Sequence, residues 1–419
     1  MDYLLQKFFE KKRWEKGISD AEQKGIHKNC LIKLCDPHIR IALLRRIIAD
    51  EYEIAPPHQQ KIPKDNGDFR IVYINEDIDR VFLNIANNLL FEEFHDMIHP
   101  ACKSYQTGIG CGKVVKEVSK QVSHAGGDVI GWKSDLSKYF DSVSIDLIDQ
   151  VFDNIEKKVG KSKIIHVLRR YYHSGLCFDI EGNLVEKYQS LKQGCPVAAF
   201  LADVLLYEMD QYLSSMNGFY VRYSDDCLYI GSDYQKAMDD MQLILTGYGL
   251  TLNPKKVEYL SPDKWFKFLG FNVRGESITL GKKRVKTFQK EIEERTIKSK
   301  YKQMASAVSA VQRYLYKGDG CYSWATSVLP VINVQTDIDT LNLFVMDCIR
   351  AVATQKKKIG GLGSVSNESH KTILRGTGRN VTANRAKTSK NIDGYYSLRC
   401  MQNALLTNRA LYDTLIRLM

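Results

Sequence analysis

The stretch FYVRYSDDCLYIG, residues 219–231, constrains the fold more than any other part of the chain. Aromatic and β-branched residues dominate it, which is typical of a strand packed on at least one face. Asp225 and Asp226 interrupt this pattern, and burying two adjacent like charges costs several kcal/mol unless a positive group compensates them. Two interpretations remain: a tight turn that lifts the pair into water, or a site that holds a cation.

A second acidic segment favours the cation site. The sequence GWKSDLSKYFDSVS places Asp135 at the end of a strand-like run and Asp141 six residues later. Metal-assisted chemistry on phosphate needs hard oxygen ligands from different elements around two Mg²⁺ ions about 3.5 to 4 Å apart. An exposed Asp-Asp turn alone is commonplace. Together with a strand-end carboxylate, however, Asp225 and Asp226 form a candidate three-carboxylate metal site with Asp135.

Length and charge set broader limits. A chain of 419 residues exceeds what one core usually supports, so we expect two or three subdomains. Lys and Arg outnumber Asp and Glu by 60 to 49, a net charge of +11 that favours a polyanionic partner, although a merely basic protein would have the same balance. Because no secretory or membrane-spanning apolar segment is found, we expect a cytoplasmic protein without a membrane partner.

The ten cysteines include no CxxC pair, so we expect them to be reduced and mostly buried. One cluster, HKNCLIKLCDPH, brings together four potential zinc ligands, His27, Cys30, Cys35 and His38. Its spacer is largely apolar and no second pair follows, which favours core packing over metal binding.

Hydrophobic periodicity predicts an α+β organisation. Residues 1–55 have helical spacing, and IPKDNGDFRIVYI predicts a hairpin around an Asn66-Gly67 turn. From 126 to 275 short strands alternate with helices, the longest expected from Ala198 to Leu213. Basic helices follow from about residue 280. The Gly- and Ser-rich basic segment after residue 354 either contacts phosphates or is a solvated linker.

Seven blocks in order, IPKDNGDFR, SYQTGIG, SDLSKYFD, LKQGCP, YSDD, GLTLNPKK and FKFLGF, resemble those of bacterial reverse transcriptases over roughly residues 60–275. The resemblance implies an RNA-directed DNA polymerase, a nucleotidyltransferase that uses two Mg²⁺ ions, with Mn²⁺ as an alternative. It also implies a right-hand polymerase fold. The expected segments are a helical N-terminal extension (1–55), fingers (56–125), a palm (126–275) with a finger-like insertion at about 150–190, and an α-helical thumb with a basic C-terminal region (276–419).

The resemblance also assigns roles to residues. It makes Asp135, Asp225 and Asp226 the catalytic metal ligands. Lys64 and Arg70 resemble residues that clamp the triphosphate of a dNTP, although in isolation they would indicate only a solvated hairpin surface.

Phe140 resembles an aromatic steric gate against a ribose 2′-hydroxyl, which favours deoxynucleotides. The nearby Asp141 keeps some ambiguity, because RNA polymerases also carry a second acid there.

Gln193 and Gly194 match the loop that contacts the template and the incoming nucleotide. Lys256 corresponds to a lysine near the pyrophosphate, with Lys255 as a competing candidate. After this loop the chain departs from the family pattern. Ala198-Ala199 replaces Ser-Pro, which predicts a longer helix, and Asp203 stands where Asn is common.

SYQTGIG is most similar to the abortive-infection and other defence-associated reverse transcriptases. Such enzymes imply a structured non-coding RNA as template and a cDNA product. The expected RNA-binding residues are Lys282, Lys283, Arg284, Lys356, Lys357, Lys358, Arg375 and Arg379. Two alternatives remain: a group II intron-like maturase that acts mainly as an RNA-binding splicing factor, and template-independent or protein-primed synthesis from a tyrosine hydroxyl.

Overall fold

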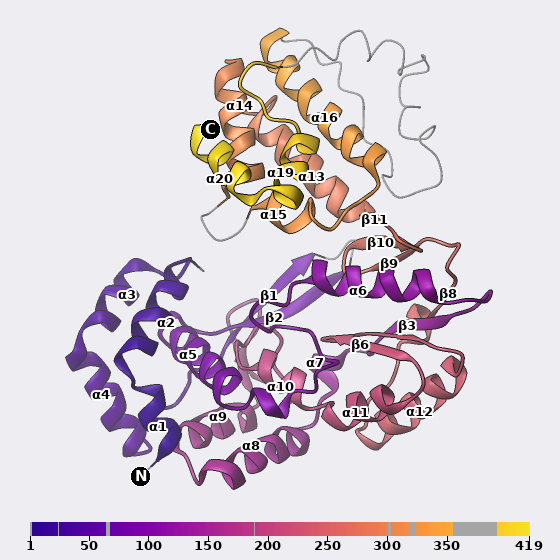
Figure 1. Ribbon diagram of the computed structural model, residues 1–419. Coiled ribbons are helices and arrows are strands. Elements are labelled where there is room, and N and C mark those ends of the chain that lie inside the picture. Colours follow the sequence, from indigo (N-terminus) through magenta and orange to yellow (C-terminus); the bar gives the residue numbers. More distant parts are fainter. Residues whose placement is uncertain are drawn as a thin grey trace. The chain divides into compact units, whose positions relative to one another are not determined.

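The computed structural model describes residues 2–23, 25–63, 68–187, 189–300, 303–318, 323–354 and 392–419. The chain divides into two compact units, one comprising Met1–Gly108 and Gly131–Glu258, the other Ile109–Ile130 and Tyr259–Met419. Both contain helices and antiparallel strands, so the predicted α+β class is confirmed (Figure 1). This division does not coincide with the four expected segments, whose boundaries stay a prediction.

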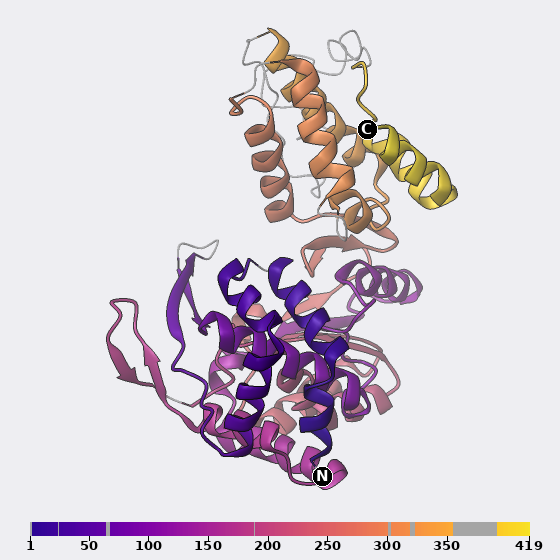
Figure 2. The ribbon, with the colours of Figure 1, turned by 90° about the vertical axis from the view of Figure 1, so that its left-hand side faces the viewer.

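Four helices precede the first strand of the first unit, in the stretch expected to be helical: α1 (Tyr3–Phe8), α2 (Lys11–Gln23), α3 (Lys28–Cys35) and α4 (Pro37–Ile48). The apolar faces of α1 and α2 pack on α5 (Asp77–Glu93), where the ring of Phe8 lies 4.8 Å from that of Phe82, whereas α3 packs on α2 and α4 packs on α3 and α9 (Lys163–His173). Figure 2 shows this bundle from the side. The buried residues belong to a hydrophobic core that extends through the unit.

The predicted hairpin is present as β1 (His58–Pro63) and β2 (Phe69–Ile74), which pair antiparallel. The Asn66-Gly67 turn lies outside the described residues. A second hairpin, β4 (Leu176–Phe178) and β5 (Leu184–Glu186), joins the first to give a sheet of order β2-β1-β4-β5. Helices α8 (Ile145–Val159) and α9 (Lys163–His173) lead into this second hairpin.

The central sheet has the order β6-β7-β3-β8, from β6 (Phe219–Tyr223), β7 (Asp226–Ile230), β3 (Gly131–Asp135) and β8 (Glu258–Leu260). The segment 219–231 therefore contains a hairpin, with Ser224 and Asp225 as its turn. Helices α11 (Tyr207–Ser215) and α12 (Tyr234–Gly247) cover one face of this sheet (Figure 1). The indole of Trp132 in β3 donates a hydrogen bond to the carbonyl of Tyr234, 2.8 Å away.

The prediction of a single helix from Ala198 to Leu213 is wrong. The chain instead forms α10 (Ala198–Val204) and α11, separated at Leu205 and Leu206. Near this break the carbonyl of Ala202 accepts hydrogen bonds from the side chains of Tyr139 and Arg222, and that of Asp203 accepts one from Arg222. Side-chain donors thus take carbonyls that a continuous helix would bond to its own amides.

In the second unit, α6 (Cys111–His124) packs on a sheet of order β11-β10-β9, from β9 (Phe266–Phe268), β10 (Phe271–Arg274) and β11 (Ser277–Leu280). The FKFLGF segment forms the β9-β10 hairpin. The helices of this unit that follow are α13 (Lys282–Arg295), α14 (Met304–Gln312), the π-helix η3 (Arg313–Lys317), α15 (Trp324–Val328), α16 (Gln335–Thr354), α19 (Leu398–Thr407) and α20 (Arg409–Leu418).

Two smaller expectations concern membranes and zinc. Within the described part of the chain, no helix has the length and apolar character needed to cross a bilayer. In the His/Cys cluster, the His27 ring caps α3 by accepting a hydrogen bond from the amide of Asn29. Cys30 is partly buried against the core, but Cys35 is exposed, so core packing holds for only one of the two thiols.

Candidate active site

The strand register brings the three predicted carboxylates together. Asp135, the last residue of β3, lies directly opposite Asp226, the first residue of β7. Asp225 precedes Asp226 in the β6-β7 turn, and its carbonyl accepts a hydrogen bond of 3.0 Å from the amide of Leu136. Antiparallel pairing thus joins the end of one strand to the turn of its neighbour, although more than 80 residues separate them in sequence.

Asp135 is buried, and its two carboxylate oxygens have different surroundings. Oδ2 accepts a hydrogen bond from Nζ of Lys256, which lies in the short 3₁₀ helix η2 (Pro254–Lys256). Oδ1 is buried and has no hydrogen-bond partner. The amide of Asn253 donates to the backbone carbonyl of Asp135 at 3.1 Å, which attaches the lysine-bearing segment to the end of β3.

Burial and neighbouring negative charge raise the pKa of Asp225 and of Asp226. Burial raises the pKa of Asp226 to about 6, and the charges of Asp225 and Asp135 add to this effect. Burial also raises the pKa of Asp225, with a further contribution from Asp135, whereas the cations Arg70 and Lys256 lower it. Burial and repulsion both disfavour the ionised forms, so an added positive charge would stabilise this site.

These residues fit a divalent cation by their chemistry. Carboxylate oxygens are the ligands that Mg²⁺ prefers, and Oδ1 of Asp135 is a buried acceptor that a cation would satisfy. Among the residues that the structure describes, no three His, Cys, Asp or Glu side chains already stand in metal-binding geometry. Lys256, whose ammonium group contacts Asp135, supplies positive charge there.

Of the two predicted triphosphate-binding residues, Arg70 lies on β2 and is exposed. The positive charge of Arg70 partly opposes the rise in the pKa of Asp225 that burial causes. Lys64 lies outside the described residues. Between the two lysine candidates near the pyrophosphate, the contact with Asp135 comes from Lys256, while Lys255 lies one residue earlier in η2.

The predicted steric gate and the Gln-Gly loop are joined through the backbone. Phe140 lies in α7 (Tyr139–Ser142), partly buried against the core, and its carbonyl accepts a hydrogen bond of 3.2 Å from the amide of Leu191. Gln193 accepts one of 2.7 Å from the amide of Tyr73 in β2. The loop therefore connects the gate to the hairpin that carries Arg70.

Gly194 has a physical reason to be glycine. Its φ of +107° is unfavourable for any L-residue, and a Cβ there would lie 2.8 Å from the carbonyl oxygen of Tyr73. The glycine thus allows the loop to approach β2 closely.

Lys192 belongs to the same loop and was missed by the sequence reasoning. Its ammonium group is buried, donates hydrogen bonds to the carbonyls of Tyr171 (2.6 Å) and Ser174 (2.8 Å), and lies 4.1 Å from the centre of the Tyr171 ring. Burial lowers its pKa to about 8. A lysine beside Gln-Gly indicates an exposed loop by sequence alone, so no local signal could have identified this anchor.

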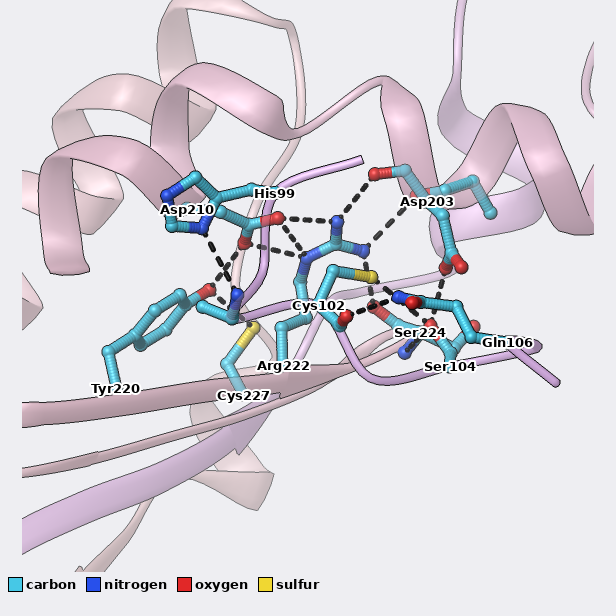
Figure 3. Close-up of polar contacts among 12 residues, drawn as sticks. His99, Cys102, Ser104, Gln106, Asp203, Asp210, Tyr220, Arg222, Ser224 and Cys227 are labelled. Carbon is cyan, nitrogen blue, oxygen red and sulfur yellow. Dashed lines mark hydrogen bonds and ion pairs between the residues drawn. The ribbon is translucent and has the colours of Figure 1, made fainter. Parts of the chain in front are cut away.

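The second missed feature is Arg222, which lies within the opening sequence. Its guanidinium is fully buried under the acidic turn and pairs with the equally buried Asp210 of α11 (Figure 3). The signal was present: an arginine inside an otherwise apolar strand must find a buried acid. Tyr220, two residues earlier, donates its hydroxyl to the same carboxylate at 3.0 Å.

The predicted RNA-binding residues are only partly described. Lys282 and Lys283 are exposed at the start of α13. Arg284 donates a hydrogen bond to the carbonyl of Leu269 at 3.2 Å and lies 4.2 Å from the centre of the Phe271 ring, so it contacts the β9-β10 hairpin. The others lie outside the described residues: Lys356, Lys357, Lys358, Arg375 and Arg379.

Comparison with known proteins identifies a protein family that matches this chain. Residues 62–273, just over half of the chain, match the family described as reverse transcriptase (RNA-dependent DNA polymerase). No curated protein matches the chain.

Several solved structures are similar at low identity. The telomerase of Candida albicans, in complex with a fragment of telomeric RNA, is 13% identical with a TM-score of 0.40, covering 62% of this chain and 52% of that one. Apo telomerase of Candida tropicalis is 14% identical with a TM-score of 0.44, covering 72% and 56%. The RNA-dependent RNA polymerase of a human picobirnavirus is 11% identical with a TM-score of 0.40, covering 52% and 44%. The chain thus spans about half the length of these proteins.

Proposed function

Because the chain belongs to the reverse transcriptase family, we propose that it is an RNA-directed DNA polymerase that copies a structured non-coding RNA into cDNA. The observation that carries the proposal is the register that sets Asp135 opposite Asp226 and beside the turn with Asp225. Two strands of one sheet and the β6-β7 turn thereby supply three carboxylates from separate parts of the sequence. Such a constellation suits phosphoryl transfer, where charge must be stabilised on both the attacking and the leaving oxygen.

In this proposal Asp135, Asp225 and Asp226 hold two Mg²⁺ ions, with Mn²⁺ as an alternative. When bound, the ions would activate the primer 3′-hydroxyl and neutralise the triphosphate. Arg70 and Lys64 bind the triphosphate as it takes on negative charge. Lys256, whose ammonium group contacts Asp135, would donate a proton to the departing pyrophosphate.

Phe140 and the Gln-Gly loop would determine which nucleotide is used. The Phe140 ring is held by core packing, and its carbonyl is bonded to Leu191 three residues before Gly194. A rigid aromatic at this position leaves no room for a 2′-hydroxyl, which favours dNTPs over NTPs. Template RNA would contact the Gln-Gly loop, and the basic residues of α13 and of the segment from Lys356 to Arg379 would bind RNA phosphates.

The biological setting rests on sequence resemblance. SYQTGIG is similar to defence-associated reverse transcriptases, so we propose that the cDNA is made in the cytoplasm as part of a bacterial antiphage response. Sequencing the nucleic acid that co-purifies with the protein tests this part directly. A discrete RNA with a complementary DNA supports the proposal, whereas intron RNA without cDNA would favour the maturase alternative.

The activity itself is tested by replacing Asp225 and Asp226 together with alanine and measuring radiolabelled dNTP incorporation on a primed RNA template with Mg²⁺. We expect a loss on the order of 10³-fold or more, because both acids would be metal ligands. The matched control is Asp239→Ala with Asp240→Ala, the chain's other adjacent aspartates, which lie on α12. Full synthesis by the Asp225/Asp226 variant would refute the proposed site.

A further inference from the structure

The turn that carries Asp225 has a second layer of support beneath it. We propose that Arg222 is a positioning residue that fixes this turn in one conformation, with Ser104 as its partner on the opposite side. The proposal deepens the polymerase function above and rests on it. It assigns to a buried arginine a role beyond neutralising its acidic partner.

The contacts of Arg222 extend well past its ion pair. Nε donates to both oxygens of Asp210, at 2.8 and 3.1 Å, and Nη2 donates to the second of these at 2.7 Å. The remaining donor capacity goes to backbone carbonyls: Nη2 to Asp203 at 2.8 Å, and Nη1 to Ala202 and Ser224, both at 3.1 Å. Figure 3 shows the guanidinium between α11, the end of α10 and the turn. One planar group therefore ties three elements together.

Ser224 is the residue that needs this support. Its φ of +59° is in the left-handed region, which is uncommon for residues other than glycine, asparagine and aspartate. Strained backbone of this kind persists only where its surroundings determine it. The carbonyl of Ser224 accepts from Arg222, and its amide donates to Oγ of Ser104 at 2.9 Å. Both polar backbone groups of the strained residue are thus held by buried side chains.

This arrangement determines how Asp225 is presented. The carbonyl of Ser224 and the amide of Asp225 belong to one rigid peptide plane, so the hydrogen bond from Arg222 sets the orientation of that plane. Ser104 is itself fixed, because its hydroxyl donates to Oδ1 of the buried Asp203. The backbone of Arg222 is fixed as well: its amide donates to Ala101, and its carbonyl accepts from Lys103, both at 2.9 Å. The turn therefore rests on segments 101–104 and 202–210 as well as on its own strands.

A purely structural role would need less. Asp210 alone would neutralise the guanidinium through the three hydrogen bonds that it accepts. The contact with Ser224 adds nothing to that neutralisation, yet it joins the buried pair to the residue next to Asp225. Loss of Arg222 should therefore affect cation binding and turnover beyond its effect on stability.

Three variants of the full-length protein separate these roles. Arg222→Lys keeps the charge but cannot span Asp210 and the three carbonyls at once. Arg222→Met with Asp210→Asn removes both charges and keeps an acceptor for Tyr220, so that no ion is left unpaired. Tyr52→Phe is the matched control, because it removes another buried hydrogen bond to an aspartate, that to Asp79 at 2.6 Å, far from the turn in sequence.

Two readouts require no turnover. Hydrogen exchange of the segment 219–231 should be at least about tenfold faster in both Arg222 variants than in wild type, because the turn samples other conformations. Mn²⁺ binding, followed by the electron paramagnetic resonance signal of the free ion, should weaken several-fold. Tyr52→Phe should leave both unchanged even where it lowers the melting temperature.

Turnover provides the third readout. In Arg222→Lys, kcat for dNTP incorporation should fall about 10- to 100-fold, since an ångström of misplacement costs about that much. A several-fold higher Mg²⁺ concentration should be needed for half-maximal rate.

The proposal is overturned if both Arg222 variants keep wild-type exchange in 219–231 and wild-type Mn²⁺ binding, because Arg222 would then only stabilise the core. Absence of dNTP incorporation by the wild-type protein would instead refute the polymerase function, and the first two measurements would still report on the turn.

Discussion

Two clusters of charge lie three residues apart on the β6-β7 hairpin, and they are built in opposite ways. Around Arg222 the ion pair with Asp210 is fully buried, and the guanidinium donates to one carboxylate and three carbonyls. Around Asp225 three like charges converge, and one oxygen of Asp135 is buried without a partner. The first cluster stabilises one conformation of the chain. The second cluster lowers the stability of the protein without a ligand, and a bound cation would restore it.

The difference teaches how a strained functional site can persist. Carboxylates that repel one another do not stay close together unaided, because they move apart or one of them takes up a proton. The neighbouring arginine supplies the rigidity, and its partners come from α10 and α11. Stability and reactivity are thus assigned to neighbouring residues of one hairpin.

The sharpest way to break this contrast is Arg222→Met, which leaves Asp210 as an unpaired buried charge. Such losses cost about 3 to 5 kcal/mol, so we expect the free energy of unfolding to fall by that amount in urea titrations. Adding Asp210→Asn should recover a substantial part of the loss. If Arg222→Met unfolds at the wild-type urea concentration, the ion pair does not stabilise the fold as argued.

Asp203 sharpens the comparison, because it belongs to the buried cluster yet has an oxygen without a partner. Burial raises its pKa to about 6, although the charge of Arg222 opposes this. Above pH 6 the folded protein therefore holds a disfavoured charge that lowers its stability. This loss of stability shrinks as the pH falls and is absent below about pH 4, where folded and unfolded chains are both protonated. Asp203→Asn should stabilise the protein by about 2 kcal/mol at pH 8, with the gain shrinking as pH falls from 6 to 4.

Thermal unfolding of wild type and Asp203→Asn between pH 4 and 8 measures this difference. Asp239→Asn, an exposed aspartate on α12, serves as the control for general effects of removing a charge. A gain that grows toward low pH would contradict the assignment.

The smallest expected effect is in the acidic cluster. Burial and the charges of Asp225 and Asp135 raise the pKa of Asp226 to about 6, so its ionised form destabilises the fold above that pH. Because the side chain is partly exposed, we expect Asp226→Asn to gain only about 1 kcal/mol at pH 8 in EDTA. The gain should vanish toward pH 4.

Metal addition provides the complementary measurement. Mg²⁺ should raise the melting temperature of the wild type, because the ion binds the folded state, and should raise that of Asp226→Asn less. If Mg²⁺ raised the melting temperature of the two proteins equally, Asp226 would not be a ligand of the proposed metal site.

Much of this site could be predicted from local sequence. Asp225 and Asp226 stand out in FYVRYSDDCLYIG because acids are rare inside strands. The assignment of Gly194 came from the family resemblance, which predicts close approach to a nucleotide, and the structure adds its close approach to Tyr73 of β2. The β1-β2 hairpin was predicted correctly, since a period-two pattern flanking turn residues determines it over a dozen residues. The helix break at Leu205 and Leu206 was not predictable, because the side chains that bond the carbonyls before it come from α7 and β6.

The sequence by itself determined that two acids interrupt the apolar run of residues 219–231 and that a hairpin precedes the first long helix of the core, because propensity and periodicity act between near neighbours. Only the tertiary structure decided the partners: Asp135 opposite Asp226, Lys256 on Asp135, Lys192 on the carbonyls at the C-terminal end of α9, and Arg222 beneath Ser224. A buried charge requires a counter-group, but the chain's local pattern does not say from which distant segment that group comes. Strand register and helix packing make that choice, since they alone fix which atoms meet.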